Sequence, residues 1–141
     1  MALAEVPESH IAEWVVMVER WTAQRARAWF AEQPWLVACN FTPSTAINQL
    51  EMWQASTFDL ATIDRELSLA ASIGMNAARV YLHDLLWLED APGFLERVDS
   101  LLTVAERHGI RVMLVLFDSC WHPEPKLGPQ PRPRKIGRAH V

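Results

Sequence analysis

The chain has 141 residues, half of which are hydrophobic, and it carries a formal net charge of −4. This composition fits a globular core and argues against a disordered chain. The length allows one domain of ordinary size. No long basic block precedes the last residues, so we expect no nucleic-acid partner.

The amino terminus predicts neither a signal peptide nor a membrane anchor. It lacks a basic start followed by a continuous apolar run. The apolar stretch at residues 14–18 is far too short to span a bilayer. We therefore expect no membrane partner and, by default, a cytoplasmic location, while a secreted parent protein stays open.

The first half of the chain predicts a helix, a strand and a second helix. Residues 9–31 place apolar side chains at helical spacing, and Ser9 is the expected N-cap. Residues 36–41 form a short apolar run typical of a buried strand, and a polar loop follows them. The next helix is expected to begin at Asp59, a favourable N-cap, and to end at Gly74.

Two further strands enclose a third helix. Residues 76–82 and 111–117 are the expected second and third strands. Between them, a helix is expected to begin near Pro92 and to end at Gly109. Its apolar positions at helical spacing should point inward, and they are Phe94, Leu95, Val98, Leu101, Leu102 and Ala105.

This order of elements predicts an α/β fold with a parallel sheet, because apolar strands alternate with amphipathic helices. The crossovers should be right-handed. A doubly wound sheet and a (β/α)₈ barrel both begin in this way, and a closed barrel needs roughly 250 residues. The turn at residues 40–44 lacks the glycines that let a dinucleotide approach, so it predicts no nucleotide site.

The two cysteines are expected to be free thiols. Cys39 and Cys120 lie near the ends of the first and third strands. Those strands would be about 9–10 Å apart in a parallel sheet, whereas a disulfide needs Cα atoms within about 7 Å.

The carboxyl-terminal tail differs in composition from the rest. From His122 onward it is rich in proline and has no apolar periodicity, which predicts loop or extended chain. Residues 136–141 can be encoded by ATC GGA AGA GCA CAC GTC, a string that resembles a common sequencing adapter. We therefore expect residues 135–141 to be a non-native read-through tail and residues 1–134 to form the domain.

Polar groups and tryptophans are expected at the carboxyl ends of the strands, where α/β barrels place their active sites. Sugar hydroxyls need hydrogen-bond partners, and the apolar face of a pyranose packs against an aromatic ring. The sequence therefore predicts a carbohydrate-binding edge without a metal or other cofactor. Its candidate residues are Asn40, Trp53, Arg79, His83, Asp84, Trp87, Asp118 and Trp121.

Arg79 is the most informative candidate because of its phase on the second strand. Alternation places Ala78, Val80 and Leu82 on the helix-covered face. The residues that should then point into the barrel are Ala77, Arg79, Tyr81 and His83. A buried arginine without a partner costs several kcal/mol, so a nearby carboxylate is predicted. The alternatives are a structural ion pair or a strand of the opposite phase.

Each remaining polar candidate also has a structural interpretation. His83 and Asp84 would face opposite ways in extended chain and could not both bind one metal without a turn, so they could instead cap a helix or fix a loop. Asp118 could serve as an N-cap or in a turn. Asn40 could bond a loop backbone.

The tryptophans, and the motifs that the sequence lacks, narrow the range of possible functions. A single tryptophan more often packs in a core than serves as a sugar platform, and those at positions 14, 21 and 29 are expected in the core. The sequence has no metal-finger spacing, no His-x-His on the first strand and no Gly-x-Ser-x-Gly elbow. These absences weigh against a metal-dependent amidohydrolase and a serine esterase.

Several segments together resemble a known enzyme family. They are QPWLVACNF at residues 33–41, NQLEMW at 48–53, NAARVYLHD at 76–84 and FDSCW at 117–121. With the third strand they resemble the clan A (β/α)₈ glycoside hydrolases, above all the cellulase, β-mannanase and β-xylanase-like branch around family 5. The resemblance covers residues 20–134 and implies a retaining hydrolase of β-linked glycans.

The resemblance also implies roles for individual residues. Arg79 would match the clan's second-strand arginine, which sits beside the nucleophile, and Asn40 would match the asparagine that often ends the first strand. Asp118 and Trp121 would line the cleft. The clan's two catalytic glutamates follow strands four and seven, which this chain lacks, and both are needed about 5–5.5 Å apart. The chain is therefore expected to be inactive by itself, as an amino-terminal piece of the barrel.

Two other functions stay open from the sequence. The first is a metal-dependent sugar isomerase or epimerase, with ligands from His83, Asp84, Asp118 and His122. The second is a non-catalytic barrel that binds carbohydrate through its tryptophans. The oligomeric state is not predicted.

Overall fold

The structure is a computed structural model, and it describes residues 20–116 and 124–131. The chain divides into two compact units, residues 1–35 and residues 36–141. Among the described residues it is a mixed α/β protein with four helices and a small parallel sheet of three strands. The expected non-native tail at 135–141 lies outside the described residues.

The first unit contributes the short helix α2, Ala23–Ala31. Thr22 is its N-cap, and its side chain accepts a hydrogen bond of 3.2 Å from the backbone N–H of Arg25. The predicted helix over 9–31 is therefore wrong over residues 20–22, which are not helical. Trp21 and Trp29 were expected in the core, but both are exposed and contact each other edge-on at 6.0 Å. Residues 9–19, with Trp14, lie outside the described part.

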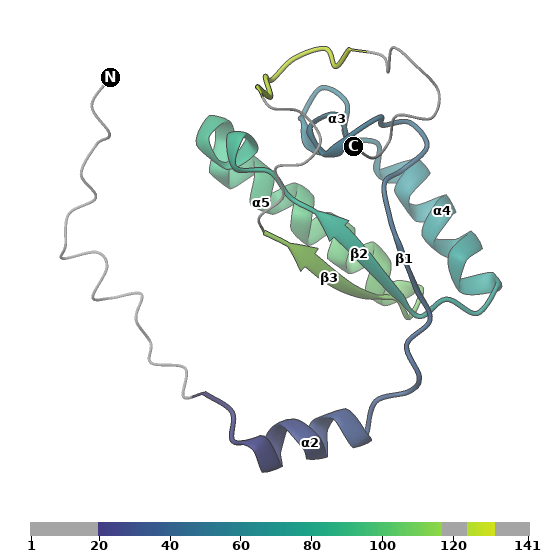
Figure 1. Ribbon diagram of the computed structural model, residues 1–141. Helices are drawn as coiled ribbons and strands as arrows, with labels where there is room; N and C mark the ends of the chain where they lie inside the picture. Colours follow the sequence, from purple (N-terminus) through teal and green to yellow (C-terminus); the bar gives the residue numbers. More distant parts are fainter. Residues whose placement is uncertain (1–19, 117–123, 132–141) are drawn as a thin grey trace. The chain divides into compact units, whose positions relative to one another are not determined.

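The second unit is built on the parallel sheet, whose strands lie in the order β1, β2, β3 (Figure 1). They span Ala38–Asn40, Ala77–Tyr81 and Arg111–Val115. All three predicted strands are confirmed in type and direction, and each is shorter than its apolar run. Phe117, the predicted end of the third strand, lies outside the described residues.

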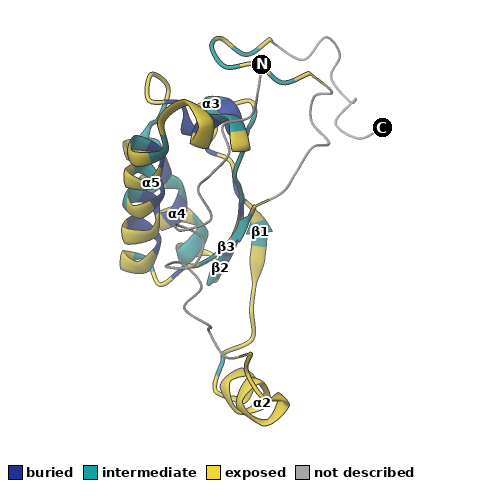
Figure 2. Cartoon of the chain, turned by 90° about the vertical axis from the view of Figure 1, so that its left-hand side faces the viewer, coloured by how far each residue is buried: buried dark blue, intermediate teal, exposed yellow. Residues whose placement is uncertain are grey.

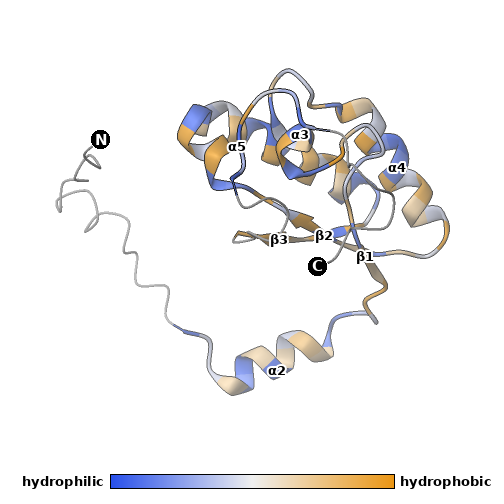
Figure 3. Cartoon of the chain, turned by 45° about the horizontal axis from the view of Figure 1, so that its top comes forward, coloured by the Kyte–Doolittle hydropathy of each residue, from blue (hydrophilic) through white to orange (hydrophobic). Residues whose placement is uncertain are grey.

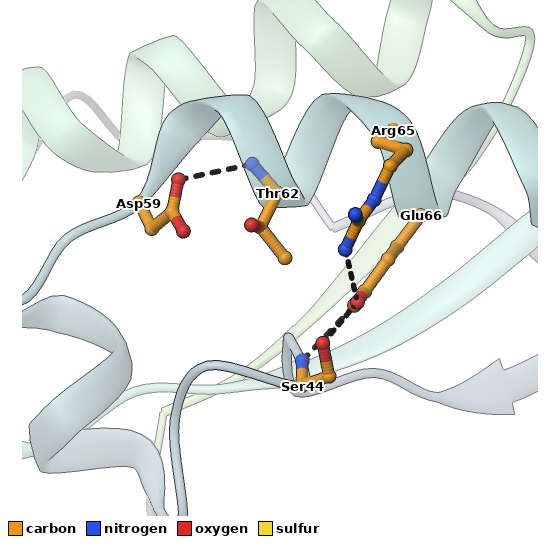
Figure 4. Close-up of polar contacts among 5 residues, drawn as sticks. All are labelled: Ser44, Asp59, Thr62, Arg65 and Glu66. Atoms are coloured by element: carbon orange, nitrogen blue, oxygen red, sulfur yellow. Dashed lines mark hydrogen bonds and ion pairs between the residues drawn. The ribbon is translucent and has the colours of Figure 1, made fainter.

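Two helices lie between β1 and β2. The first, α3, spans Gln49–Trp53, has Asn48 as its N-cap and was not predicted from the sequence. The second, α4, spans Leu60–Ser72. Asp59 caps it as predicted, accepting a hydrogen bond of 3.0 Å from the N–H of Thr62 (Figure 4). Gly74 follows α4 with φ of 89°, a conformation that favours glycine.

The helix α5 spans Asp84–Arg107 and contains a kink. Asp90 has non-helical backbone angles and accepts a hydrogen bond of 3.0 Å from the N–H of Gly93. It thereby caps the second half of α5, which begins near Pro92 as predicted. The helical turns before the kink were not predicted. Gly109 ends the element with φ of 68°, also as expected.

The core lies on one face of the sheet, between the strands and the helices α4 and α5 (Figure 2). Ala78 and Val80 of β2 are buried there in one hydrophobic cluster with Ile63 and Leu67 of α4. From α5, the predicted residues Phe94, Val98, Leu101 and Ala105 are buried, together with Val104. Leu95 and Leu102, also predicted to point inward, are exposed, because the apolar set of α5 is wider than the face that the sheet covers.

Candidate functional site

Asn40 and Arg79 lie side by side at the carboxyl end of the sheet. The register of β1 and β2 pairs these two residues, and the N–H of Phe41 donates a hydrogen bond of 2.9 Å to the carbonyl oxygen of Arg79. Both residues are exposed, while Ala78 and Val80, their neighbours in the alternation of β2, are buried against the helices. The predicted phase of the second strand is therefore confirmed.

Arg79 differs from the prediction in its surroundings. It was expected to be buried beside a carboxylate, but it is exposed, and no carboxylate of the described residues pairs with it. Its guanidinium carbon lies 4.9 Å from the centre of the Tyr81 ring instead. The ring attracts the cation and holds the side chain along the strand, on the face opposite the helices. The arginine can therefore bind a partner without first breaking an ion pair.

His83 acts at the start of α5, as its structural interpretation predicted. It is the N-cap residue, and its Nδ1 atom lies 3.2 Å from the N–H of Leu85 and 2.8 Å from Oδ1 of Asp84. Nδ1 can accept from Leu85 only when unprotonated and donate to Asp84 only when protonated, so the two contacts are alternatives. The side chain of His83 is 9% exposed, against 81% for Asp84. Of these two side chains, that of Asp84 is the one available to a ligand.

The tryptophans divide between core and surface. Trp53 was predicted to bind substrate, but its side chain is fully buried, with an exposed fraction of 0%. Its ring packs between Phe58 and Phe94, and its indole N–H donates to the carbonyl oxygen of Tyr81, so it is a core residue that supports the end of β2. Trp87, in the first turns of α5, is 51% exposed and can contact a ligand. Asp118 and Trp121 lie outside the described residues.

A clamp between α3 and the proline-rich segment was not predicted. Both backbone groups of Gly128 bond the amide of Gln54: the N–H donates to Oε1, and the carbonyl oxygen accepts from Nε2 at 3.2 Å. The amide of Asn48 donates to Oε1 of Gln130 at 2.8 Å. Leu127 packs against the core beside them. The sequence holds no signal for this clamp, because amide pairing follows no fixed spacing along a chain.

A second unpredicted contact ties the loop after β1 to α4 (Figure 4). The backbone N–H of Ser44 donates to Glu66 Oε2 at 3.1 Å, and its hydroxyl donates to Oε1 of the same carboxylate. Arg65 lies 3.5 Å from Oε1 of that group. Since Glu66 already accepts three partners, it holds the loop in place and is not a free acid or base.

The carboxylate of Asp64 joins α4 to the end of α5. Its Oδ1 atom lies 2.6 Å from Nε2 of His108 and 2.8 Å from the guanidinium of Arg107. The hydrogen bond from His108, followed by the positive charge of Arg107, lowers the pKa of Asp64 below its ordinary value. The pKa of Asp59 is also lowered, chiefly by its hydrogen bonds with Thr62. Both carboxylates therefore favour their charged forms and serve the fold.

The described residues contain neither a cluster of metal ligands nor a helix that could cross a membrane. Within 20–116 and 124–131, no three histidine, cysteine or acidic side chains are grouped so that they could hold a metal ion. Nor does any helix in this part of the chain have the length and apolar character needed to cross a membrane. Cys39 is a free thiol, as expected, while Cys120 lies outside these residues.

Comparison with known proteins assigns no family. No protein-family model matches the chain, and neither a curated protein nor a solved structure is significantly similar to it.

Proposed function

We propose that this chain is the amino-terminal part of a (β/α)₈ barrel, and that the parent protein is a retaining glycoside hydrolase acting on β-linked polysaccharides or oligosaccharides. The observation that carries the proposal is the pairing of Asn40 with Arg79 on the face of a parallel sheet that lies opposite α4 and α5. In such barrels this face points inward and the strand ends form the active-site rim. The amide and the guanidinium offer hydrogen-bond groups to a sugar hydroxyl or to a carboxylate.

The exposed groups near the strand ends have the chemistry that a sugar needs. Trp87 offers an aromatic ring for the apolar face of a pyranose, and Asp84 offers an acceptor for hydroxyl groups. Asp118 and Trp121 are proposed for the same rim on the resemblance alone. Arg79 would support a nucleophile supplied by a later strand.

The proposal predicts that the chain alone does not turn over substrate. Retaining hydrolysis needs two carboxylates about 5–5.5 Å apart, one as acid/base and one as nucleophile. In the family that the sequence resembles, these follow strands four and seven, whereas the described residues form three strands. Release of reducing sugar from a β-glucan, mannan or xylan by the purified chain would contradict this part of the proposal. A cytoplasmic location is proposed only by default.

A titration followed by NMR tests the sugar site. Soluble β-linked gluco-, manno- and xylo-oligosaccharides are added at millimolar concentration to the isotope-labelled full chain. We expect at least one of them to shift the side-chain amide of Asn40, the backbone amide of His83 and the indole N–H of Trp87.

Matched variants make this titration specific. Arg79→Ala should weaken the shifts by about tenfold in apparent affinity, since hydrogen bonds to a charged group contribute about 1.5–3 kcal/mol. Arg65→Ala, on the exposed side of α4, should leave them unchanged. If none of the three sugars perturbs the strand ends, or if both variants bind equally, the carbohydrate proposal is wrong.

A further inference from the structure

The sheet has a second face, and no helix of the second unit lies on it within the described residues. Alternation and register place eight strand residues there, opposite α4 and α5 (Figure 2). We call this set the open face: Ala38, Asn40, Ala77, Arg79, Tyr81, Arg111, Met113 and Val115. Its β3 part is mostly hydrophobic (Figure 3), and Met113 is 62% exposed.

In the second unit, the arginines of the open face and the acidic side chains of α5 lie on opposite sides of the sheet. The charged residues of the open face are two arginines, Arg79 and Arg111, and neither forms an ion pair within the described part of the chain. The helix α5, on the other side of the sheet, carries six acidic residues and two arginines. The open face is thus basic in a protein whose formal net charge is −4.

The open face adjoins a strand edge that no other described strand pairs with, which we call the free edge of β3. The order of the sheet makes β3 an outer strand, paired with β2 along one side. Unpaired backbone N–H and C=O groups along an edge are a template for a further strand. With five residues, β3 offers a longer edge than β1, which has three and carries no charge.

We propose that the open face and the free edge of β3 bind an extended polypeptide segment that presents carboxylates to Arg79 and Arg111. A strand added to β3 would lie about 4.8 Å from it and would direct alternate side chains onto the open face. Arg111 is on β3 itself, and Arg79 is one strand further, within reach of a long acidic side chain. Guanidinium groups bind carboxylates through paired, charge-assisted hydrogen bonds.

The same charges argue against a second copy of this chain stacked face to face. That arrangement would bring the guanidinium groups of Arg79 and Arg111 against those of the other copy, and like charges at a buried interface oppose association. An extended acidic segment would pair its carboxylates with the two arginines and its backbone with the edge of β3. In the proposed barrel a later strand would pair with β3 and the open face would point inward. This inference therefore concerns binding to the present chain by itself, and its failure would not count against the hydrolase proposal.

A synthetic peptide of alternating glutamate and valine is the probe for this surface. A peptide with glutamine in place of every glutamate is its matched control. With the full isotope-labelled chain, the acidic peptide should shift the backbone amides of β3 and the methyl group of Met113. The glutamine peptide should bind about tenfold or more weakly, and added salt should weaken the acidic peptide alone.

Variants of the chain test whether the two arginines contribute to the affinity for the acidic peptide. The double variant Arg79→Gln, Arg111→Gln should lose about tenfold or more in affinity for the acidic peptide, while Arg65→Gln on α4 should lose none. Circular dichroism of each variant establishes that the fold is retained, and the single variants replace the double one if it unfolds.

Four outcomes would overturn the proposal: equal affinity for the two peptides, no loss in the arginine variants, shifts confined to the helices, or no binding at all. A discrete dimer that protects the amides of β3 without peptide would identify a second copy as the occupant and would also overturn it. Failure of the oligosaccharide titration with intact peptide binding would count against the hydrolase proposal alone.

Discussion

The indole N–H of Trp53 donates a hydrogen bond of 2.8 Å to the carbonyl oxygen of Tyr81. This bond connects α3 to the last residue of β2, and the ring that makes it is fully buried. Phe58 stacks on the indole with ring centres 5.9 Å apart, and Phe94 meets it edge-on at 5.7 Å. The end of β2, where Arg79 and Tyr81 lie, is therefore fixed by a residue far away in sequence.

Replacing this indole should cost much of the stability of the second unit. Trp53→Ala should lower the free energy of unfolding by about 3–5 kcal/mol, because it leaves a cavity. Trp53→Phe should cost less, about 1–3 kcal/mol, chiefly because the Tyr81 carbonyl loses its donor. Denaturant unfolding measures both. Trp87→Ala, at an exposed position, should stay within about 0.5 kcal/mol, and an equal loss in Trp87→Ala and Trp53→Ala would contradict the assignment.

The phase of β2 can be tested by substituting adjacent residues. Val80 is completely buried, so Val80→Asp would place an unpaired carboxylate in the core and should cost more than about 3 kcal/mol. Arg79→Asp, next to it on the open face, should keep the fold. Near-ultraviolet circular dichroism reports the loss of tertiary structure. If Arg79→Asp unfolded the protein and Val80→Asp did not, the two faces of β2 would be interchanged.

The contact of Asp64 with His108 and Arg107 should make stability depend on acidity. The pKa of Asp64 is lower in the folded state than in the unfolded state, so its charged form stabilises the fold at neutral pH. This contribution should be lost as the pH falls below about 4, through the lowered pKa.

Thermal melts of the Asp64→Asn variant test that dependence. The variant should melt at a lower temperature than the native chain at pH 7, and the difference should shrink at acid pH. Asp99→Asn, an exposed carboxyl on α5, should show no such difference at either pH. If the difference in melting temperature between Asp64→Asn and the native chain stayed constant down to strongly acid pH, the role of the ion pair would be contradicted.

The clamp between Gln54 and Gly128 should control the segment at residues 124–131. Gln54→Ala removes both partners of the Gly128 backbone and should cost about 1–3 kcal/mol. Hydrogen exchange of the Gly128 amide should become faster. Gln54→Glu keeps the acceptor and loses the donor, so its effect should be intermediate. Gln24→Ala, on exposed α2, is the control, and equal exchange in all variants would mean that the clamp is unimportant.

Local sequence signals determined the elements that depend on nearby residues. Asp59 as an N-cap and Gly74 and Gly109 as helix ends were predictable, because caps and positive φ angles follow from short-range sterics and hydrogen bonds. The alternation of Ala78, Arg79 and Val80 predicted the two faces of β2, because side chains in a strand alternate by geometry. The parallel order of the three strands followed from the same patterns.

Only the tertiary structure decided what those residues contact. Trp53 was expected at a binding surface and is in the core, because its burial depends on Phe58, Phe94 and the end of β2 rather than on its neighbours in sequence. Arg79 has an aromatic ring beside it where a carboxylate was expected. The clamp of Gln54 on Gly128 joins residues 74 positions apart. Such contacts depend on how separate elements pack, which no local spacing along the chain encodes.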